Sequence, residues 1–440
     1  MIKITPLDEW IHKKINGEGS CLGKADLEAY QLDKLNWTLS YVRKHSPFYR
    51  QHLAGLPDQI HALAELNQFP LSGADDLRRE PLAFVCVPQD QIHRIVTLQT
   101  SGTTGQPKRV FFTAEDQDLT IDFFGVGMSV LTEPDERVLI LLPGERPGSV
   151  GELLSRGLTR AGKVPVAHGP VVDPLLTLER MEQAGIDCLV GAPVQVLSLA
   201  EHWQPGKRKP RTVLLSTDYV PNAIVHRIEE TWGCEVFNHY GTTEMGLGGG
   251  VECSAHRGYH LREADLYFEL IDPKSGFPAA KGEDGEVVFT TLTRQGMPLF
   301  RYRMDDLSRF LPEYCPCGTS LRTLEKPGST QARSLPVTLL TRPVRRLCAP
   351  GWEVRSRANI TTPTAIIDRA RSTPSFPDIL GTSGSDTIRE HVTMKRVSRT
   401  SPRPADAVET PDCLERPTLP TAAQTFPGMY FPSSETKWIE

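Results

Sequence analysis

The sequence predicts a layered α/β domain with parallel strands, followed by a smaller β-rich subdomain. Between residues 114 and 237, short apolar runs typical of strands alternate with stretches of helical length. Such alternation is typical of parallel sheets that are covered by helices. After about residue 250 the pattern changes to strands that are separated by glycine, proline and aspartate turns. A chain of 440 residues is long enough for two or three domains and a large core.

The changes of pattern divide the chain into four expected segments. They are a helical segment packed on the core (1–90), the α/β core (91–250), the β-rich subdomain (251–326) and an atypical, poorly ordered region (327–440). In the first segment, apolar residues at helical spacing predict one or two helices over 27–53, ending near Ser46-Pro47.

Helices and strands follow from the apolar periodicity and from the residues that start and stop it. The expected helices cover 75–79, 114–131, about 149–160, 175–184, 194–201 and 223–232. The expected strands cover 95–98, 110–112, 137–142, 164–167, 188–190, 213–216, 235–237, 267–271 and 285–292. Thr113 is the expected N-cap of the helix over 114–131, with Asp116 in its first turn. Ser149 and Glu152 have the spacing of a capping box at the start of the helix expected over about 149–160.

Composition and charge exclude several classes of protein. A net charge of -5 and a pI of about 6.2 favour neither a nucleic-acid-binding nor a membrane-surface protein. No apolar run approaches the roughly 20 residues of a membrane span, and residues 1–6 lack the apolar core of a signal peptide. The nine cysteines are an odd number, which favours reduced thiols over disulfides. We expect a cytoplasmic protein, with a homodimer among the options for its oligomeric state.

The most informative stretch is the loop from Thr100 to Lys108, which lies between two expected strands. Gly102 and Gly105 can adopt backbone angles that let successive N–H groups turn toward one anion. Lysine adds a positive charge, and hydroxyl donors come from Thr100, Ser101, Thr103 and Thr104. These features predict a site for a polyphosphate. The P-loop of nucleoside triphosphatases is a different pattern, because Pro107 separates glycine from lysine here and a strand follows.

A second polar stretch, Asn238–Glu244, directly follows the expected strand 235–237. Ligands of open α/β sheets bind at the carboxyl ends of strands, so this position is typical of a site. Tyr240 offers a flat face for an adenine ring, and Gly241 permits the turn. Thr242 and Thr243 can donate to phosphate oxygens, and the carboxylate of Glu244 is a suitable ligand for Mg²⁺.

These two stretches together resemble the adenylate-forming superfamily, which includes the acyl-CoA synthetases. The loop reads Ser-Gly-Thr-Thr-Gly-x-Pro-Lys and the second stretch reads Tyr-Gly-x-Thr-Glu, both in the superfamily order. Ser46-Pro47-Phe48-Tyr49-Arg50 further resembles the phenylacetate–CoA ligase branch, although aromatic packing would explain these residues equally well. The resemblance covers about residues 27–326. It implies a large layered N-terminal domain that binds ATP and Mg²⁺, with Lys108, Thr243 and Glu244 as catalytic residues.

The resemblance also implies a reaction. ATP and a small carboxylic acid, by analogy an aromatic one, would form an acyl-adenylate and pyrophosphate. Coenzyme A would then take the acyl group and release AMP. An acceptor other than coenzyme A, and a catalytically impaired remnant that still binds nucleotide or metal, are the alternatives.

A third stretch, Arg301–Leu307, takes the place of the superfamily pattern Tyr-Arg-Thr-Gly-Asp-Leu. The aspartate of that pattern bonds both ribose hydroxyls, and Asp306 occupies its position. Asp305 is a rival, because Met304 and Asp305 depart from the pattern. Ser216-Thr217-Asp218 takes the place of a further nucleotide-contacting loop, although the match is weak.

Three cysteines and one histidine form a candidate metal site. Cys253 and His260 are followed by Cys315-Pro316-Cys317-Gly318, and three sulfurs with one imidazole are the ligands of a closed structural zinc site. His256 competes with His260 as the fourth ligand. The surrounding segment resembles phenylacetate–CoA ligase relatives that hold such a zinc.

The expected pattern is lost from residue 327 onward. Superfamily members continue there with a small mobile domain after a basic hinge, whereas this chain becomes rich in arginine, serine, threonine and proline with little apolar periodicity. The sequence therefore predicts that the mobile domain is absent, degenerate or replaced by a frameshifted reading over 327–425. Lys437, near the end, is a candidate for the terminal lysine of the superfamily.

Overall fold

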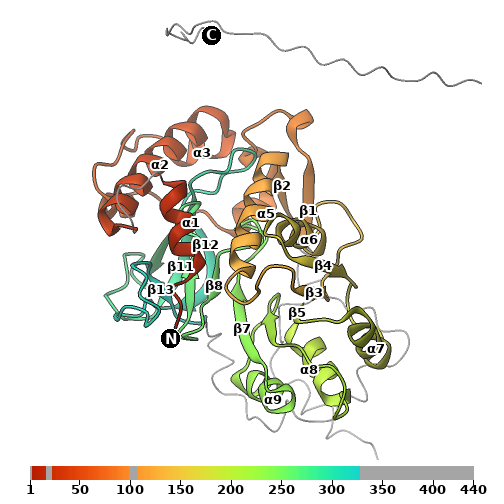
Figure 1. Ribbon diagram of the computed structural model, residues 1–440. Helices are drawn as coiled ribbons and strands as arrows, with labels where there is room; N and C mark the ends of the chain where they lie inside the picture. Colours follow the sequence, from red (N-terminus) through yellow and green to blue (C-terminus); the bar gives the residue numbers. More distant parts are fainter. Residues whose placement is uncertain (1, 16–21, 99–106, 328–440) are drawn as a thin grey trace, which may run out of the picture. The chain divides into compact units, whose positions relative to one another are not determined.

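An eight-stranded mixed sheet forms the middle layer of the fold in a computed structural model (Figure 1). The structure describes residues 2–15, 22–98 and 107–327. The strands, in sheet order, are β13 (Thr323–Leu324), β9 (Tyr259–Leu261), β8 (Gly250–Glu252), β7 (Glu235–Tyr240), β6 (Thr212–Leu215), β5 (Cys188–Gly191), β3 (Arg137–Ile140) and β4 (Val164–Ala167). The five strands from β7 to β4 are parallel, as the strand–helix alternation predicts, whereas β8, β9 and β13 are antiparallel.

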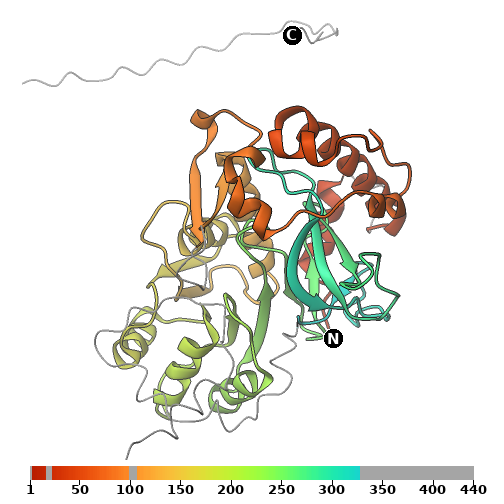
Figure 2. The ribbon, with the colours of Figure 1, turned by 180° about the vertical axis from the view of Figure 1, so that it is seen from behind.

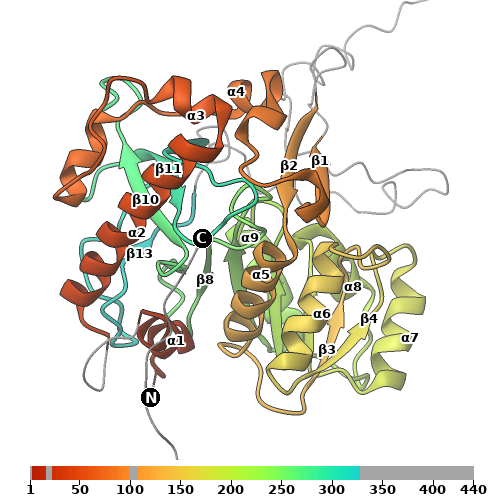
Figure 3. The same cartoon turned by 90° about the horizontal axis from the view of Figure 1, so that it is seen from above.

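Helices cover both faces of the parallel part of the sheet. One face carries α5 (Ala114–Met128) and α6 (Val150–Arg160), with α1 (Pro6–Lys14) packed beside α5, and the other carries α7 (Pro174–Ala184), α8 (Pro193–His202) and α9 (Asn222–Trp232). Figure 3 shows α5 and α6 side by side over the sheet. Because side chains alternate along a strand, Val138 and Ile140 of β3 enter the first core while Leu139 and Leu141 enter the second.

A second, three-stranded antiparallel sheet is the β-rich part of the fold. It consists of β10 (Leu266–Ile271), β11 (Gly285–Thr291) and β12 (Tyr302–Ser308). Its apolar side chains share a core with α2 (Lys24–His45) and α3 (Pro47–His52), and Figure 2 shows the sheet next to these red and orange helices. The change of pattern near residue 250 therefore does not end the large sheet. It marks the point where that sheet continues in antiparallel strands before the second sheet begins.

The remaining elements are short. They are α4 (Ala74–Arg79), the 3-10 helices η1 (Leu63–Gln68), η2 (Pro81–Phe84) and η3 (Gln89–Gln91), and the antiparallel hairpin strands β1 (Arg94–Leu98) and β2 (Lys108–Phe112). Strands on both sides of the glycine-rich loop are thus confirmed. Residues 99–106 of that loop, the whole C-terminal region from 328 and Lys437 lie outside the described residues.

The two expected helix caps have different outcomes. At the start of α5, Thr113 and Asp116 form a capping box, in which each side chain accepts the other residue's backbone N–H at 3.1 Å. At the start of α6 the predicted box is wrong. Glu152 accepts from the backbone N–H of Gly148 at 3.0 Å, one residue before the expected cap, and the buried Ser149 hydroxyl has no partner among the described residues.

Helix α1 is not predicted by the apolar periodicity. This helix begins after Thr5, which caps it, and buries Leu7 and Ile11. One of its polar contacts reaches far along the chain, because Asp8 accepts from the Thr319 hydroxyl at 2.5 Å. The phenylacetate–CoA ligase-like segment 46–50 forms aromatic contacts, with the rings of Phe48 and Phe84 stacked at 4.0 Å. In the described part of the chain, no helix is long and apolar enough to cross a membrane.

Two glycines of α5 provide a test of how closely α5 and α6 pack. A Cβ atom added at Gly125 would lie 2.8 Å from the backbone oxygen of Gly157, which cannot move without shifting α6. A Cβ added at Gly127 would lie 3.8 Å from a Val251 methyl group, an ordinary contact. We expect Gly125→Ala to lower the free energy of unfolding by about 1–3 kcal/mol.

The matched control is Gly127→Ala. It should be neutral or stabilising by up to about 1 kcal/mol, since alanine favours the helix more than glycine does. Urea denaturation of both variants measures the difference. Equal effects of the two substitutions would contradict the close approach of α5 and α6.

Candidate functional site

The candidate site is built on the carboxyl end of β7, where the chain turns immediately after Tyr240. The turn is held by backbone bonds: the Tyr240 carbonyl accepts from Gly249 at 2.9 Å, and the Thr242 carbonyl accepts from Leu247 at 2.8 Å. The hydroxyl of Thr242 is buried and has no hydrogen-bond partner among residues 2–15, 22–98 and 107–327. A buried hydroxyl without a partner is unusual in native proteins, so it marks a place where a ligand group would be stabilised.

An ion pair joins this turn to the strand that follows the glycine-rich loop. Lys108, the first residue of β2, contacts the carboxylate of Glu244, whose side chain is only 3 % exposed. The two residues were predicted to act on the same polyphosphate, and the structure brings them together. Thr100 to Gly105, which complete the predicted loop, lie outside the described residues.

The third sequence stretch also meets the turn. The Tyr240 hydroxyl donates to Oδ2 of Asp306 on β12 at 2.9 Å, and the Tyr240 ring stacks on Tyr259 with centroids 5.7 Å apart. Burial raises the pKa of Asp306, although the bond from Tyr240 opposes that shift. Burial also raises the pKa of the Tyr240 hydroxyl, which therefore remains a donor at neutral pH.

Asp305 and Asp306 occupy different environments because β12 is irregular at this point. Its pairing with β11 shifts between Glu286 and Val288, which leaves Asp305 in a bulge. Asp305 has a left-handed φ of 59° and an exposed side chain, and its backbone N–H donates to Glu286 at 3.3 Å. The bulge leaves Asp306 as the aspartate that contacts Tyr240.

His239 is a residue of this region that the sequence analysis did not single out. Its Nδ1 lies 3.0 Å from the hydroxyl of Ser216, so the ends of β6 and β7 are linked by side chains. Burial lowers the pKa of His239 to about 4, and the imidazole is therefore neutral at physiological pH. The only sequence signal was its place beside Tyr240 at a strand end.

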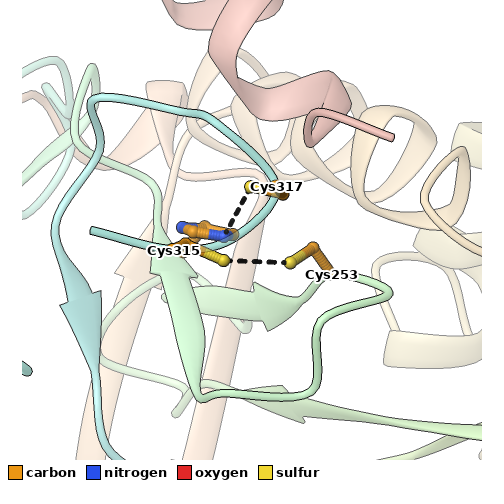
Figure 4. A group of neighbouring side chains, drawn as sticks. Cys253, Cys315 and Cys317 are labelled. Atoms are coloured by element: carbon orange, nitrogen blue, oxygen red, sulfur yellow. Dashed lines mark hydrogen bonds between the residues drawn. The ribbon is translucent and has the colours of Figure 1, made fainter. Parts of the chain in front are cut away.

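The four predicted metal ligands lie together near the C-terminal end of β8, which directly precedes Cys253. The sulfur atoms of Cys253, Cys315 and Cys317 and one ring nitrogen of His260 all lie within 4.8 Å of one another, and all four residues are buried. Figure 4 shows the three thiol groups pointing toward a common centre. The hydrogen bond from Cys253, followed by a smaller contribution from His260, lowers the pKa of the Cys317 thiol.

The alternative ligand, His256, lies outside this group. Its Nε2 is 3.0 Å from Glu235, and its Nδ1 is 3.6 Å from the buried carboxylate of Glu252. Hydrogen bonding to Glu252 raises the pKa of His256, which gives the imidazole the character of an ion-pair partner rather than of a metal ligand. The geometry thus places His260 with the thiols.

Comparison with known proteins identifies the family. Residues 58–293 match the family described as AMP-binding enzyme, a stretch that includes the glycine-rich loop and the turn after Tyr240. The chain belongs to this family of adenylate-forming enzymes. It is similar to the phenylacetate–coenzyme A ligase of Thermus thermophilus, with 31% identity over 325 residues that cover 68% of each chain. The phenylacetate–coenzyme A ligase of Escherichia coli K12 is 29% identical over 323 residues, which cover 70% of this chain and 71% of the other.

Solved structures of AMP-binding enzymes share the fold. A 2-hydroxyisobutyryl-CoA ligase, in complex with an acyl-AMP and CoA, superposes with a TM-score of 0.63 at 22% identity, covering 69% of this chain and 68% of that one. The likeness supports the mixed α/β architecture described above. The family match ends at residue 293, before Asp306, Cys315 and Cys317, so the proposed roles of these residues rest on sequence pattern and geometry.

We propose that Cys253, His260, Cys315 and Cys317 hold one structural zinc ion. Three thiols and an imidazole at this spacing fit the tetrahedral site that zinc prefers, and four protein ligands leave no open position for catalysis. The ion would join β8 and β9 to the loop that precedes β13, and so fix the antiparallel edge of the large sheet.

Metal analysis of two matched variants tests the zinc site. The purified protein should contain about one zinc per chain, and Cys315→Ser should lose most of it because one of four ligands is gone. His256→Gln should retain the metal, since His256 is not in the ligand group. Inductively coupled plasma mass spectrometry measures the content, and a chelator should lower the melting temperature of the wild type. Zinc that is lost from His256→Gln and kept by Cys315→Ser would contradict the assignment.

Proposed function

We propose that this protein adenylates a carboxylic acid with ATP and then transfers the acyl group to coenzyme A. One observation supports this most strongly. Three stretches that are far apart in the chain meet at the end of β7, through the Lys108–Glu244 ion pair and the Tyr240–Asp306 hydrogen bond. These are the stretches whose residue types suit a polyphosphate, an adenine ring and a ribose.

Asp306 would bind the ribose of ATP and Tyr240 would face the adenine. A carboxylate can accept hydrogen bonds at both oxygens, so the bond from Tyr240 orients Asp306 while leaving acceptor capacity for the ribose hydroxyls. The raised pKa of Asp306 is consistent with a carboxylate held in a partly buried site, where hydrogen bonds are stronger than in water.

Lys108, Thr242 and Thr243 would contact the phosphates. Lysine supplies a positive charge that offsets the charge developing on the leaving pyrophosphate, and the unpartnered Thr242 hydroxyl supplies a donor. Glu244 fits a magnesium site, since it is a buried hard carboxylate; its Oε1 contacts the ammonium of Lys108, which magnesium would replace as the partner of that oxygen. Magnesium, when bound there, would neutralise phosphate charge.

The reaction proceeds in two steps. A carboxylate oxygen of the acid attacks the α-phosphorus of ATP, and the bond to the β-phosphate oxygen breaks to release pyrophosphate. The thiolate of coenzyme A then attacks the acyl carbonyl, and AMP leaves with the bonding electron pair. An aromatic acid is the proposed substrate, because the chain is similar to phenylacetate–coenzyme A ligases.

Pyrophosphate exchange with a panel of carboxylates tests the first step. We expect ATP–pyrophosphate exchange that depends on an aryl acid, such as phenylacetate, and that exceeds exchange with aliphatic acids of similar size. Addition of coenzyme A should then accelerate the release of AMP. Exchange without this acceleration would indicate another acceptor, and silence across the panel with ATP still bound would indicate a catalytically impaired nucleotide-binding protein.

The two neighbouring aspartates provide a matched test of nucleotide binding. Asp306→Asn removes a charged acceptor and should weaken ATP binding roughly 10- to 100-fold, since a hydrogen bond to a charged group contributes about 1.5–3 kcal/mol. Asp305→Asn should leave ATP affinity within about twofold, because Asp305 is exposed in the bulge. Isothermal titration calorimetry measures both, and a larger loss with Asp305→Asn would refute the assignment of Asp306.

A further inference from the structure

Arg294 is a buried arginine close to the candidate site, and neither the sequence pattern nor the family match assigns it a role. It lies in the segment between β11 and β12, one residue beyond the end of the family match. Arg294 is only 5 % exposed, and its guanidinium lies 4.9 Å from the centroid of the Phe112 ring. Within the described part of the chain, the guanidinium has no hydrogen-bond acceptor and no ion-pair partner.

A buried guanidinium without a partner is costly. Its charge persists at neutral pH, because burial lowers the pKa of Arg294 only to about 10. The nearby carboxylates already have partners. Asp116 accepts three backbone N–H groups, and Glu244 is paired with Lys108. Folded proteins rarely bury a cation in this way unless an anion compensates it.

The surroundings of Arg294 locate that anion. A Cβ atom at Gly246 would lie 3.0 Å from Nη2 of Arg294, so the guanidinium lies directly against the turn that carries Thr242 to Glu244. The Tyr302 hydroxyl is also buried and has no partner within the residues that the structure describes, and besides burial the nearby charge of Glu244 raises its pKa. Thr242, Tyr302 and Arg294 are therefore three donors near Glu244 that have no hydrogen-bond partner among the described residues.

We propose that Arg294 is an anion-binding residue of this site and pairs with an oxyanion of a ligand. The shared chemistry is a negatively charged oxygen, which either a phosphate of the nucleotide or the carboxylate of the acid would supply. The choice of a nucleotide phosphate or an acid carboxylate as the ligand rests on the proposed function. The inference that Arg294 binds an anion does not. The planar fork of guanidinium donors suits both groups, since each presents two oxygens at matching spacing.

The same protein contains a matched control. Arg262 is also buried and lies 5.1 Å from the centroid of an aromatic ring, that of Phe123. Unlike Arg294, it is paired: its Nε donates to Asp265 at 2.7 Å, and its Nη2 donates to a backbone carbonyl at 2.7 Å. Arg262 therefore represents an arginine that has a structural role in a similar environment.

The test compares Arg294→Met, Arg294→Lys and Arg262→Met in stability and in binding. Without ligand, Arg294→Met should melt at or above the wild-type temperature, because it removes an uncompensated buried charge. Arg262→Met should melt lower, because it leaves Asp265 with one fewer partner. The binding probes are ATP with Mg²⁺, inorganic pyrophosphate and phenylacetate, each measured by calorimetry on the full chain.

The affinities decide the proposal and distinguish the two sources of the anion. A loss of about tenfold or more for ATP and pyrophosphate with Arg294→Met, partly restored by Arg294→Lys, assigns the phosphate. A similar loss for phenylacetate alone assigns the carboxylate. Wild-type affinities for all probes, a wild type that binds none of them, or an Arg294→Met protein that is destabilised like Arg262→Met, would each overturn it. Failure of acid-dependent pyrophosphate exchange would refute the proposed function while leaving the binding comparison intact.

Discussion

The ion pair between Lys108 and Glu244 is the contact on which the candidate site depends. It joins the strand after the glycine-rich loop to the turn after β7, and both carry residues that were expected to meet one polyphosphate. Breaking one partner of such a buried pair costs about 3–5 kcal/mol, because the other charge is left uncompensated. The pair therefore holds the two segments in place, even though it adds little net stability compared with a pair of well-packed apolar side chains. A charged ligand that binds there must replace the Lys108–Glu244 contact with its own contacts to these two side chains.

Strand β7 connects this site to the metal-ligand group. Its residue Asn238 donates from both backbone and side chain to the fully buried carboxylate of Glu252, each at 2.8 Å. Glu252 also pairs with Lys326 at 2.9 Å and directly precedes Cys253. The strand that ends in Tyr240 is thus bonded to the strand that leads into the four ligands. A zinc ion held at Cys253, as proposed, would restrain β8, the strand that pairs with the end of β7.

Local pattern was a reliable guide where the structure is decided locally. The strand–helix alternation, the strands beside the glycine-rich loop and the Thr113 cap were predicted because each depends on residues within a few positions. The errors occurred where a distant contact prevailed. Helix α1 was missed although Thr5 begins it, since its burial and its bond to Thr319 come from the far end of the described chain. The capping box predicted at Ser149 is wrong because the Glu152 carboxylate accepts from the backbone N–H of Gly148 instead.

By itself the sequence determined which chemistry this protein contains: a glycine- and hydroxyl-rich loop with lysine, a Tyr-Gly-x-Thr-Glu turn, and three cysteines with a histidine at metal-ligand spacing. Only the tertiary structure decided between neighbours of the same type. It turned Asp306 rather than Asp305 toward Tyr240, and it placed His260 rather than His256 among the thiols. It also left Arg294 buried with no hydrogen-bond or ion-pair partner in the described part of the chain. The physical reason is that spacing along the chain specifies residue types, whereas a bulge, a strand pairing or a missing counter-charge depends on segments that meet only after folding.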